Sequence, residues 1–250
     1  MTSEDFVPAP LRRLWGITES SRLGRPAALD VDRIVAAAVE LADRDGLDGV
    51  TLPKVAKTLD VTGMSLYRHV GSKDELLALM ADVGLGSPPQ LETGDWRAGL
   101  HGWAMAQRAV FERRPWLTRV PAAGPPSGPH QIEWMEAAFA TMAATRLDWA
   151  HKVGILSLVS GYVSQAVRQS SDLAEGRDEG QGQADAERDY GRALVRLVAP
   201  DRFPETARLF ASSLFEAPPS DTPDDDMASA DFVLGLEIIL DGIAVEIARP

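Results

Sequence analysis

A chain of 250 residues, 45% hydrophobic and 6% aromatic, has an ordinary globular composition, with room for one large domain or a small and a larger one. The lack of cysteine excludes disulfides and thiolate zinc sites and fits a reducing compartment. The net charge of −12 argues against nucleic-acid binding by the chain as a whole, but residues 1–80 are near neutral, with 10 Lys and Arg against 12 Asp and Glu.

The two ends of the chain carry no signal for the membrane. Residues 1–28 have acidic residues ahead of the arginines and no long apolar core, so we expect a flexible N-terminal arm and not a signal peptide. The apolar run 231–248 is interrupted by four acidic residues, which makes it a poor membrane span. We therefore expect a cytoplasmic protein.

Apolar residues recur at spacings of three and four along the chain, which predicts an all-α fold without strands. In residues 29–80, helix-start residues and terminal glycines predict helices at 30–44, 51–59 and 62–70, and a fourth that begins at Ser72. Ser72 and Glu75 have the spacing of a capping box. This segment forms a small first domain.

The remaining residues, 81–250, predict a larger helical domain. Its six helices are expected at about 95–113, 130–145, 147–170, 184–199, 203–215 and 228–248. Segments rich in Pro, Gly or polar residues predict loops at 121–129, 170–183 and 217–226.

The second and third helices, TLPKVAKTL and TGMSLYRHV, are joined by a tight turn, which is the arrangement of a helix-turn-helix. Val55 and Ala56 face inward from the second helix, and Leu66 and Val70 pack back from the third. The third helix is short, as expected for a helix whose N-terminal end enters a major groove.

Residues 30–80, and VTGMSLYRHVGSKDELL in particular, resemble the DNA-binding domain of the tetracycline-repressor (TetR) family. The arm LRRLWG and SRLGRPAALD also resembles extensions that precede this domain in some members, whereas residues 81–250 match only in their helical plan. Asp60 departs from the glycine common in the turn, but Asp tolerates the left-handed conformation better than most residues. The resemblance implies a cytoplasmic, nucleoid-associated homodimer that regulates transcription, binds a palindromic operator and an unknown small-molecule effector, and needs no cofactor.

The family pattern assigns the DNA contacts to the helix-turn-helix. Tyr67, His69 and Lys73 resemble phosphate-contacting positions, although Tyr67 can also be a packed aromatic and His69 a helix C-terminal cap. The base-reading set, together with the helix-start residue Thr51, is Thr62, Gly63, Met64, Ser65 and Arg68. The chain has no Asn, so we expect readout through Arg68 to guanine, methyl contacts and DNA shape.

Arg22 and Arg25 lie in the N-terminal arm, which can reach a minor groove or remain a disordered tail.

Small residues in the helix 147–170 and apolar residues in the helix 228–248 suggest a four-helix dimer interface, with an internal helix pair of a monomer as the alternative. The predicted interface residues are Gly154, Ser157, Gly161, Ser164, Phe232, Leu236, Ile239 and Ile243.

Aromatic residues and a few polar groups of the larger domain suit a pocket for an apolar or aromatic effector, although each can also be plain core. The predicted pocket residues are His101, Trp103, Gln107, Trp134, Phe139, Tyr162 and Gln165. Gln107 and Gln165 are the sharper candidates, because an amide on an apolar face needs a partner.

Two other functions compete with a ligand-responsive repressor. The four histidines lack metal-ligand spacing and no nucleophile or phosphate-loop motif appears, so an enzyme or metal site is not supported. A helical scaffold without DNA binding is favoured only by the near-neutral first domain. Repressor and activator cannot be separated from the sequence.

Overall fold

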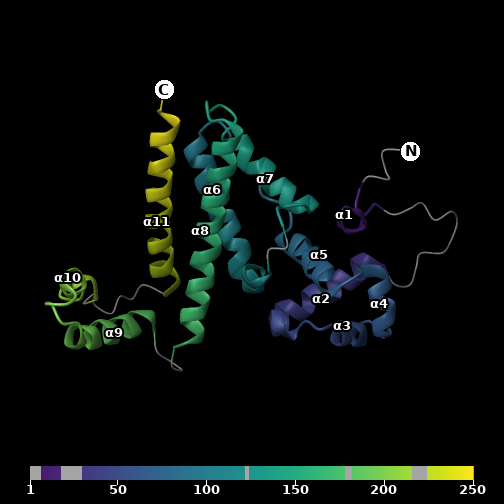
Figure 1. The fold of residues 1–250 in the computed structure, drawn as a ribbon, viewed down its shortest axis with the longest axis horizontal. Helices are drawn as coiled ribbons and strands as arrows, with labels where there is room; N and C mark the ends of the chain where they lie inside the picture. The colour runs from purple at the N-terminus through teal and green to yellow at the C-terminus, as the bar shows by residue number, and fades with distance from the viewer. Residues whose placement is uncertain (1–6, 18–29, 122–123, 178–181, 216–223, 250) are drawn as a thin grey trace. The chain divides into compact units, whose positions relative to one another are not determined.

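The computed structural model describes residues 7–17, 30–121, 124–177, 182–215 and 224–249, and in these ranges the chain is helical, without strands (Figure 1). It divides into two compact units. The first is Met1–Arg168 with Ile243–Pro250, and the second is Gln169–Gly242. The all-α prediction is confirmed.

The head of the first unit consists of α1 (Ala9–Leu14), α2 (Val31–Asp45), α3 (Leu52–Thr58), α4 (Gly63–Val70) and α5 (Lys73–Leu85). Three predicted N-caps are present, since the side chains of Asp30, Thr51 and Ser72 accept from the backbone N–H three residues later. Gly46 and Gly71 end α2 and α4 with positive φ angles of 70° and 76°, as glycines at helix ends commonly do.

The helix-turn-helix packs as the apolar pattern predicts. Val55 and Ala56 of α3 and Leu66 and Val70 of α4 are buried in one core with α2 and α5. Asp60, in the turn, has φ 54°, the left-handed value that the resemblance to a glycine position implied. Trp116, from the short 3₁₀ helix η3 (Pro115–Arg119), joins this core.

The rest of the first unit is built from α6 (Trp96–Arg113), α7 (Pro129–Thr141) and the greater part of α8 (Trp149–Glu175). Asp95 caps α6 by accepting from the backbone N–H groups of Arg97 and Ala98. Gly99 of α6 is buried, and a Cβ there would lie 2.6 Å from the Thr141 side chain, so glycine lets α6 and α7 approach closely.

The second unit contains the end of α8, then α9 (Gln183–Leu197), α10 (Pro204–Phe210), η4 (Ser213–Phe215) and most of α11 (Asp224–Ile247). Tyr190, Phe210 and Phe215 form an aromatic cluster with ring centroids 5.2–6.1 Å apart. Gly191 lies against Phe215, where a Cβ would clash.

Three predictions of element type or extent were wrong. The helix α8 continues to Glu175, because SSDLAE after residue 169 is compatible with a helix and Gly176 follows it. The segment 203–215 breaks into α10 and η4. The region predicted as a flexible arm contains the helix α1, started by Pro8 and Pro10.

Candidate nucleic-acid interface

The recognition helix α4 exposes the side chains that would meet DNA. Met64 is 72% exposed and Tyr67 48%, although both are large and hydrophobic, and Arg68 is exposed beside them. Leu66 and Val70 lie on the opposite, buried face. The interpretation of Tyr67 as a packed aromatic is therefore not supported by its burial.

The polar side chains of this surface have no protein partner among the described residues. In the part of the chain that the structure describes, no hydrogen bond or ion pair is made by the side chains of Tyr67, Arg68, His69 or Lys73. Lys73 is exposed at the first position of α5, and His69 is half-buried in the last turn of α4. These groups can donate to an anion without first breaking a contact in the protein.

The N-terminal ends of the two helices carry the smaller candidates. Thr51 accepts a 3.4 Å hydrogen bond from Lys54 N, and so the structure places it as the N-cap of α3. Thr62 does not cap α4 but lies 3.1 Å from Ser65, Oγ1 to Oγ, and a Cβ on Gly63 would meet nothing within 4 Å. The open backbone at Gly63 allows close approach of a ligand.

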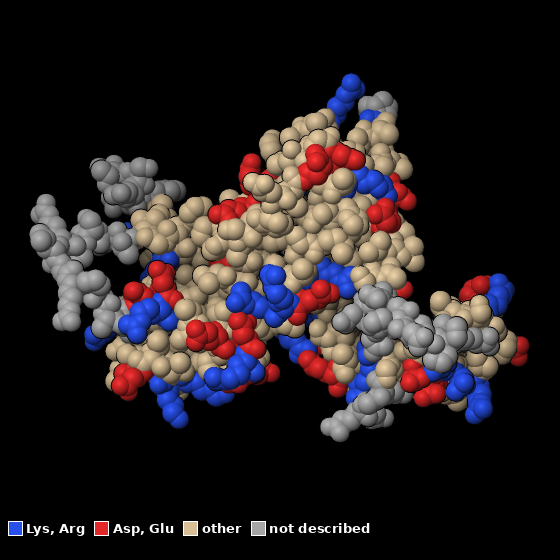
Figure 2. Space-filling model, turned by 180° about the vertical axis from the view of Figure 1, so that it is seen from behind, with Lys and Arg blue, Asp and Glu red and all other residues tan. Residues whose placement is uncertain are grey.

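Charges around the head are mixed. In the view of Figure 2 the Lys and Arg side chains are interspersed with Asp and Glu, consistent with the near-neutral composition of residues 1–80. Arg22 and Arg25, predicted to contact the minor groove, lie outside the described residues.

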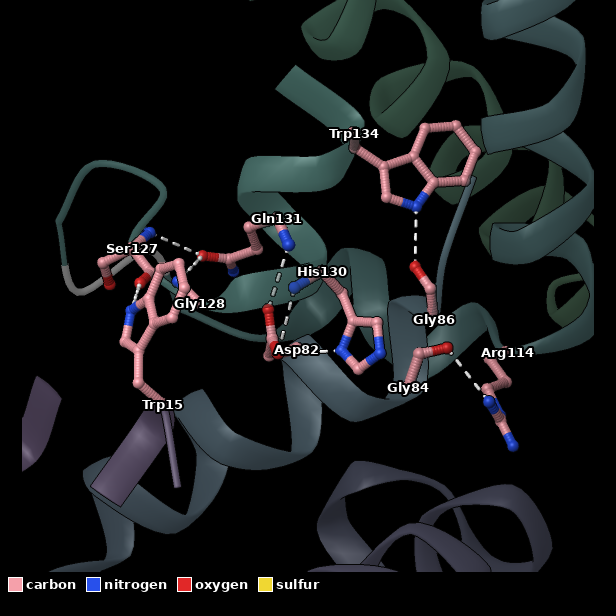
Figure 3. Close-up of polar contacts among 10 residues, drawn as sticks. All are labelled: Trp15, Asp82, Gly84, Gly86, Arg114, Ser127, Gly128, His130, Gln131 and Trp134. Atoms are coloured by element: carbon pink, nitrogen blue, oxygen red, sulfur yellow. Dashed lines mark hydrogen bonds and ion pairs between the residues drawn. The ribbon is translucent and has the colours of Figure 1, made fainter. Parts of the chain in front are cut away.

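The helix α5 leaves the head and is held to α7 by a buried acid, Asp82, which is 2% exposed (Figure 3). Its carboxylate accepts from Gln131 N at 3.0 Å and lies 2.9 Å from His130 Nδ1 and 3.4 Å from His130 N. A carboxylate at the first turn of a helix is favoured by the N–H groups that have no partner within the helix. The sequence analysis missed Asp82, although a lone acid in the apolar run LLALMADVGL was a signal.

Two carbonyls at the C-terminal end of α5 also accept hydrogen bonds, from the junction of α6 and η3 and from α7. Gly84 O accepts from Arg114 Nη1 at 3.0 Å, and Gly86 O accepts from Trp134 Nε1 at 2.8 Å (Figure 3). Arg114 also pairs with Asp43 of α2, which accepts from Trp116 Nε1 as well. We call these contacts, with those of Asp82, the joint, because they connect head helices to α6, η3 and α7.

The predicted effector residues divide into buried and exposed groups. Trp103 and Trp134 are buried and packed edge to face, and Trp103 Nε1 donates to Trp134 O at 2.9 Å. Gln107, one turn further along α6, is only 5% exposed, and its Oε1 has no partner among the described residues. A buried carbonyl without a donor is costly, so a donor from outside the described residues would stabilise this oxygen.

The other four effector candidates are less enclosed. Phe139 is half-buried, with its ring 5.5 Å from that of Trp149, and His101 and Tyr162 are half-buried as well. Gln165 is exposed, on the same face of α8 as Gly154, Leu158 and Gly161, because these residues are three and four apart. The expectation of a buried amide is therefore wrong for Gln165.

No described residue covers Gly154 or Gly161, on the small-residue face of α8. Gly154, Ser157 and Gly161 are exposed, Ser164 is half-buried, and a Cβ on either glycine would meet nothing within 4 Å.

On α11 the expected interface residues Phe232, Leu236 and Ile243 are buried within the single chain, and Ile239 is half-buried. As contact side chains for a partner these three are a correction, because the 3.6-residue period turns them inward. The exposed apolar residues of α11 are instead Leu234, Ile238 and Val245.

Two features are absent from the described ranges. No helix there is both long and apolar enough to cross a membrane. No group of three or more metal-ligating side chains occurs among the same residues.

Comparison with known proteins agrees with the helix-turn-helix. Residues 34–80 match "Bacterial regulatory proteins, tetR family" and residues 87–247 match "Tetracyclin repressor-like, C-terminal domain". The HTH-type transcriptional repressor DrrR1 of Streptomyces coeruleorubidus is 34% identical over 252 residues, covering 97% of this chain and 87% of that protein. An HTH-type transcriptional regulator of Saccharopolyspora erythraea is 32% identical over 160 residues, 63% of this chain and 67% of that one.

Among solved structures, the TetR family protein ActR of Streptomyces coelicolor, in complex with actinorhodin, superposes with a TM-score of 0.70 at 27% identity, over 89% of this chain and 99% of that one. The second matched domain alone spans more than half of the chain. The chain therefore belongs to the TetR family of helix-turn-helix transcriptional regulators and is not an enzyme.

Proposed function

We propose that this protein is a ligand-responsive transcriptional repressor, which binds a palindromic operator as a homodimer and is released by a small, mostly apolar effector. The observation that carries the proposal is the exposed face of α4, where Met64, Tyr67 and Arg68 point to solvent with no competing contact among described residues. A helical scaffold without DNA binding would not require an exposed surface of this composition. The repressor DrrR1, similar over nearly the full chain, favours repression over activation.

On this proposal Tyr67, His69 and Lys73 bind phosphates and fix the register, while Arg68 and Met64 read base edges. Arg68 suits guanine, which offers two acceptors in the major groove, and Met64 suits a thymine methyl group. Thr62, Gly63 and Ser65 bring the start of α4 close to the bases.

Dimerisation supplies the second recognition helix that a two-fold operator requires. On α8, Gly154 and Gly161 are exposed glycines inside a helix, which cost about 1 kcal/mol each relative to Ala, and no neighbour in the chain uses the space they leave. A partner helix would use it. On α11, Leu234, Ile238 and Val245 offer an exposed apolar stripe.

The effector is proposed to bind beside Gln107 and Trp103. The buried, unpartnered Oε1 of Gln107 would accept a hydrogen bond, so the effector carries a hydroxyl, phenol or N–H group on an otherwise apolar frame. The similarity to ActR, which was solved in complex with actinorhodin, supports a larger domain that accommodates a small-molecule ligand.

Release follows from differential affinity. In the DNA-bound form the two α4 helices lie about one DNA turn apart, roughly 34–36 Å. An effector beside α6 would shift α7, and the joint through Asp82 and Trp134 would pass this shift to α5 and α4. The loss of DNA affinity is limited by the effector's preference for the shifted form.

The test begins with selection of duplex DNA from a random pool by the purified protein. Arg68→Ala should relax preference at particular base pairs, at a cost of about 1–3 kcal/mol each. Lys73→Ala should weaken every sequence about equally and lower the slope of affinity against salt by about 1.

Arg208→Ala is the matched control, because it removes an exposed arginine of α10 in the second unit and should leave binding unchanged. Failure to enrich any site, or unchanged binding by both head variants, would contradict the proposal. A reporter gene behind the selected site separates repression from activation.

A further inference from the structure

The short helix α1, in the segment that composition alone assigned to a flexible arm, makes contacts at both of its sides. It has six residues, none of them buried, and is far below the length at which a helix is stable alone. Leu14 packs at the edge of the head core. The neighbouring Arg13 and Trp15 add polar contacts that help to fix where α1 lies.

Arg13 binds the first turn of α5, next to the turn in which the recognition helix α4 ends. Its Nε donates to Glu75 Oε2 at 3.0 Å, and its Nη2 pairs with the same oxygen. The guanidinium lies so close to this turn that a Cβ on Gly71 would be 2.8 Å from Nη2. Glu75 N in turn donates to Ser72, the N-cap of α5, next to the phosphate-binding candidate Lys73.

Trp15 binds the segment that starts α7. Its Nε1 donates to Ser127 O at 2.8 Å (Figure 3). This segment is itself well fixed, since Gln131 Oε1 accepts from Ser127 N and Gly128 N, and a Cβ on Gly128 would clash with Asp82. Trp15 is therefore attached to a rigid helix start and not to a loose loop.

We propose that α1 and Trp15 form a strap that ties the first turn of α5, at Glu75, to the residue before the N-cap of α7, Ser127, with Arg13 and Trp15 as positioning residues for DNA binding. The strap lies outside the joint and adds a second connection between the head and α7. Asp82 lies near the C-terminal end of α5 and binds the first turn of α7. The strap binds the other end of α5, near its N-terminus. The inference rests on the proposed function only for its consequence in DNA binding.

The two attachments of α1 depend on each other, whereas two independent contacts would not. Loss of either attachment should loosen the other end, because α1 is too short to be stable by itself and Leu14 lies only at the edge of the head core. Trp15→Phe removes the N–H donor but keeps an aromatic ring, and Arg13→Gln removes the charge but keeps a polar side chain. Each variant therefore tests transmission to the end that it does not touch.

The measurement is backbone hydrogen exchange on the full-length, DNA-free protein. Trp15→Phe should speed exchange at residues 71–76, and Arg13→Gln should speed it at 127–132, each by about 3- to 10-fold. The double variant should exceed the larger single effect by less than twofold. Arg13→Lys, which keeps an ion pair with Glu75, should restore at least half of the protection.

Arg208→Gln controls for the loss of an exposed arginine pair, and Trp96→Phe controls for the loss of an indole in the same unit. An unchanged melting temperature of the variants separates the local effect from global unfolding. Faster exchange only at the mutated end, or additive effects in the double variant, would overturn the strap. Because no DNA is present, this result is independent of whether the selected operator is bound.

The consequence for function is read separately, with the duplex recovered by selection. Both variants should weaken binding to it by about 2- to 5-fold, as expected when a contact residue is held less firmly, and Arg13→Lys should recover most of this loss. Unchanged affinity in both variants would overturn the positioning role. Failure of the wild-type protein to bind any duplex would instead count against the proposed function.

Discussion

Gln107 has a buried polar atom, Oε1, without a hydrogen-bond partner among the described residues, and this predicts opposite effects of one substitution on stability and on ligand binding. Gln107→Leu replaces the amide by an apolar side chain of similar size among the tryptophans. Without effector, it should stabilise the fold by about 1 kcal/mol or leave it unchanged, because a desolvated carbonyl without a donor is removed. Calorimetry of the ligand-free protein measures this.

The same variant should lose at least about tenfold in affinity for an effector that releases DNA, since its donor then has no acceptor. Compounds paired as hydroxyl and methyl ether provide the control, because Gln107→Leu should no longer distinguish them. A variant that is strongly destabilised would mean that Gln107 supports the fold and does not await a ligand.

Residue by residue, the sequence predicted the positions governed by local chemistry. Asp60 was recognised as a turn residue able to take a left-handed conformation, and its φ of 54° agrees. Gln107 and Gln165 looked equivalent, since each is an amide among apolar residues, but one is buried and the other exposed. Which face of a helix is covered depends on partners distant in the chain, and a single helix period cannot name them.

At the scale of elements, helix starts were predictable because caps act within four residues. The capping box at Ser72 formed only on one side: Ser72 accepts from Glu75 N, whereas the carboxylate of Glu75 binds Arg13, 62 residues earlier. Likewise, the joint is made of indole N–H groups, a guanidinium and carbonyls whose pairing follows from tertiary packing. Propensity and periodicity carry no information on such contacts, so α1 and Asp82 were missed.

His151, near the start of α8, contacts Glu246, near the end of α11, and the contribution of this contact to stability should depend on pH. His151 Nδ1 lies 2.6 Å from Asp148 and Nε2 lies 3.3 Å from Glu246. The hydrogen bond to Asp148, then its charge, raises the pKa of His151 above 6.5, and the charge of Glu246 adds to this, whereas desolvation and the charge of Arg249 oppose it. The hydrogen bonds from His151 lower the pKa of Asp148 below 3.8.

A histidine whose pKa is higher in the folded than in the unfolded chain stabilises the fold. This stabilisation is fully present at pH values below the unfolded pKa and is lost as the pH rises through the folded pKa. The lowered carboxyl pKa acts at the acid side, where its contribution is lost as pH falls below about 4. The melting temperature of wild type relative to His151→Gln should therefore be highest at about pH 5–6 and decline above pH 7. Asp148→Asn should bring the histidine titration, followed by NMR, back toward its usual pKa, and a pH-independent difference would refute the linkage.

At the scale of the whole molecule, the charge distribution suits a protein that meets DNA only through its head. Residues 1–80 are nearly neutral, so most of the net charge of −12 belongs to the remainder of the chain. That remainder repels phosphate. A phosphate that approaches the exposed cations of α4 and the first turn of α5 meets no comparable excess of negative charge. A nearly neutral head gains little long-range attraction to DNA, so two linked copies should bind far more tightly than one.

On the proposed function, operator binding depends on dimerisation, and one side chain tests this. Ile238 is 64% exposed on α11, so Ile238→Glu should leave the fold of each chain intact while placing a charge in the proposed interface. Leu214→Glu is the matched control, because Leu214 has the same 64% exposure in η4.

Sedimentation should show a monomer for Ile238→Glu at concentrations where the wild type and Leu214→Glu remain dimers, with operator affinity reduced at least about 100-fold. A dimer that survives Ile238→Glu would place the two-fold contact elsewhere than on this stripe of α11. A variant that becomes monomeric yet still binds a palindromic site as tightly as the wild type would show that the two heads act separately. In that case an effector could not work by changing the distance between them.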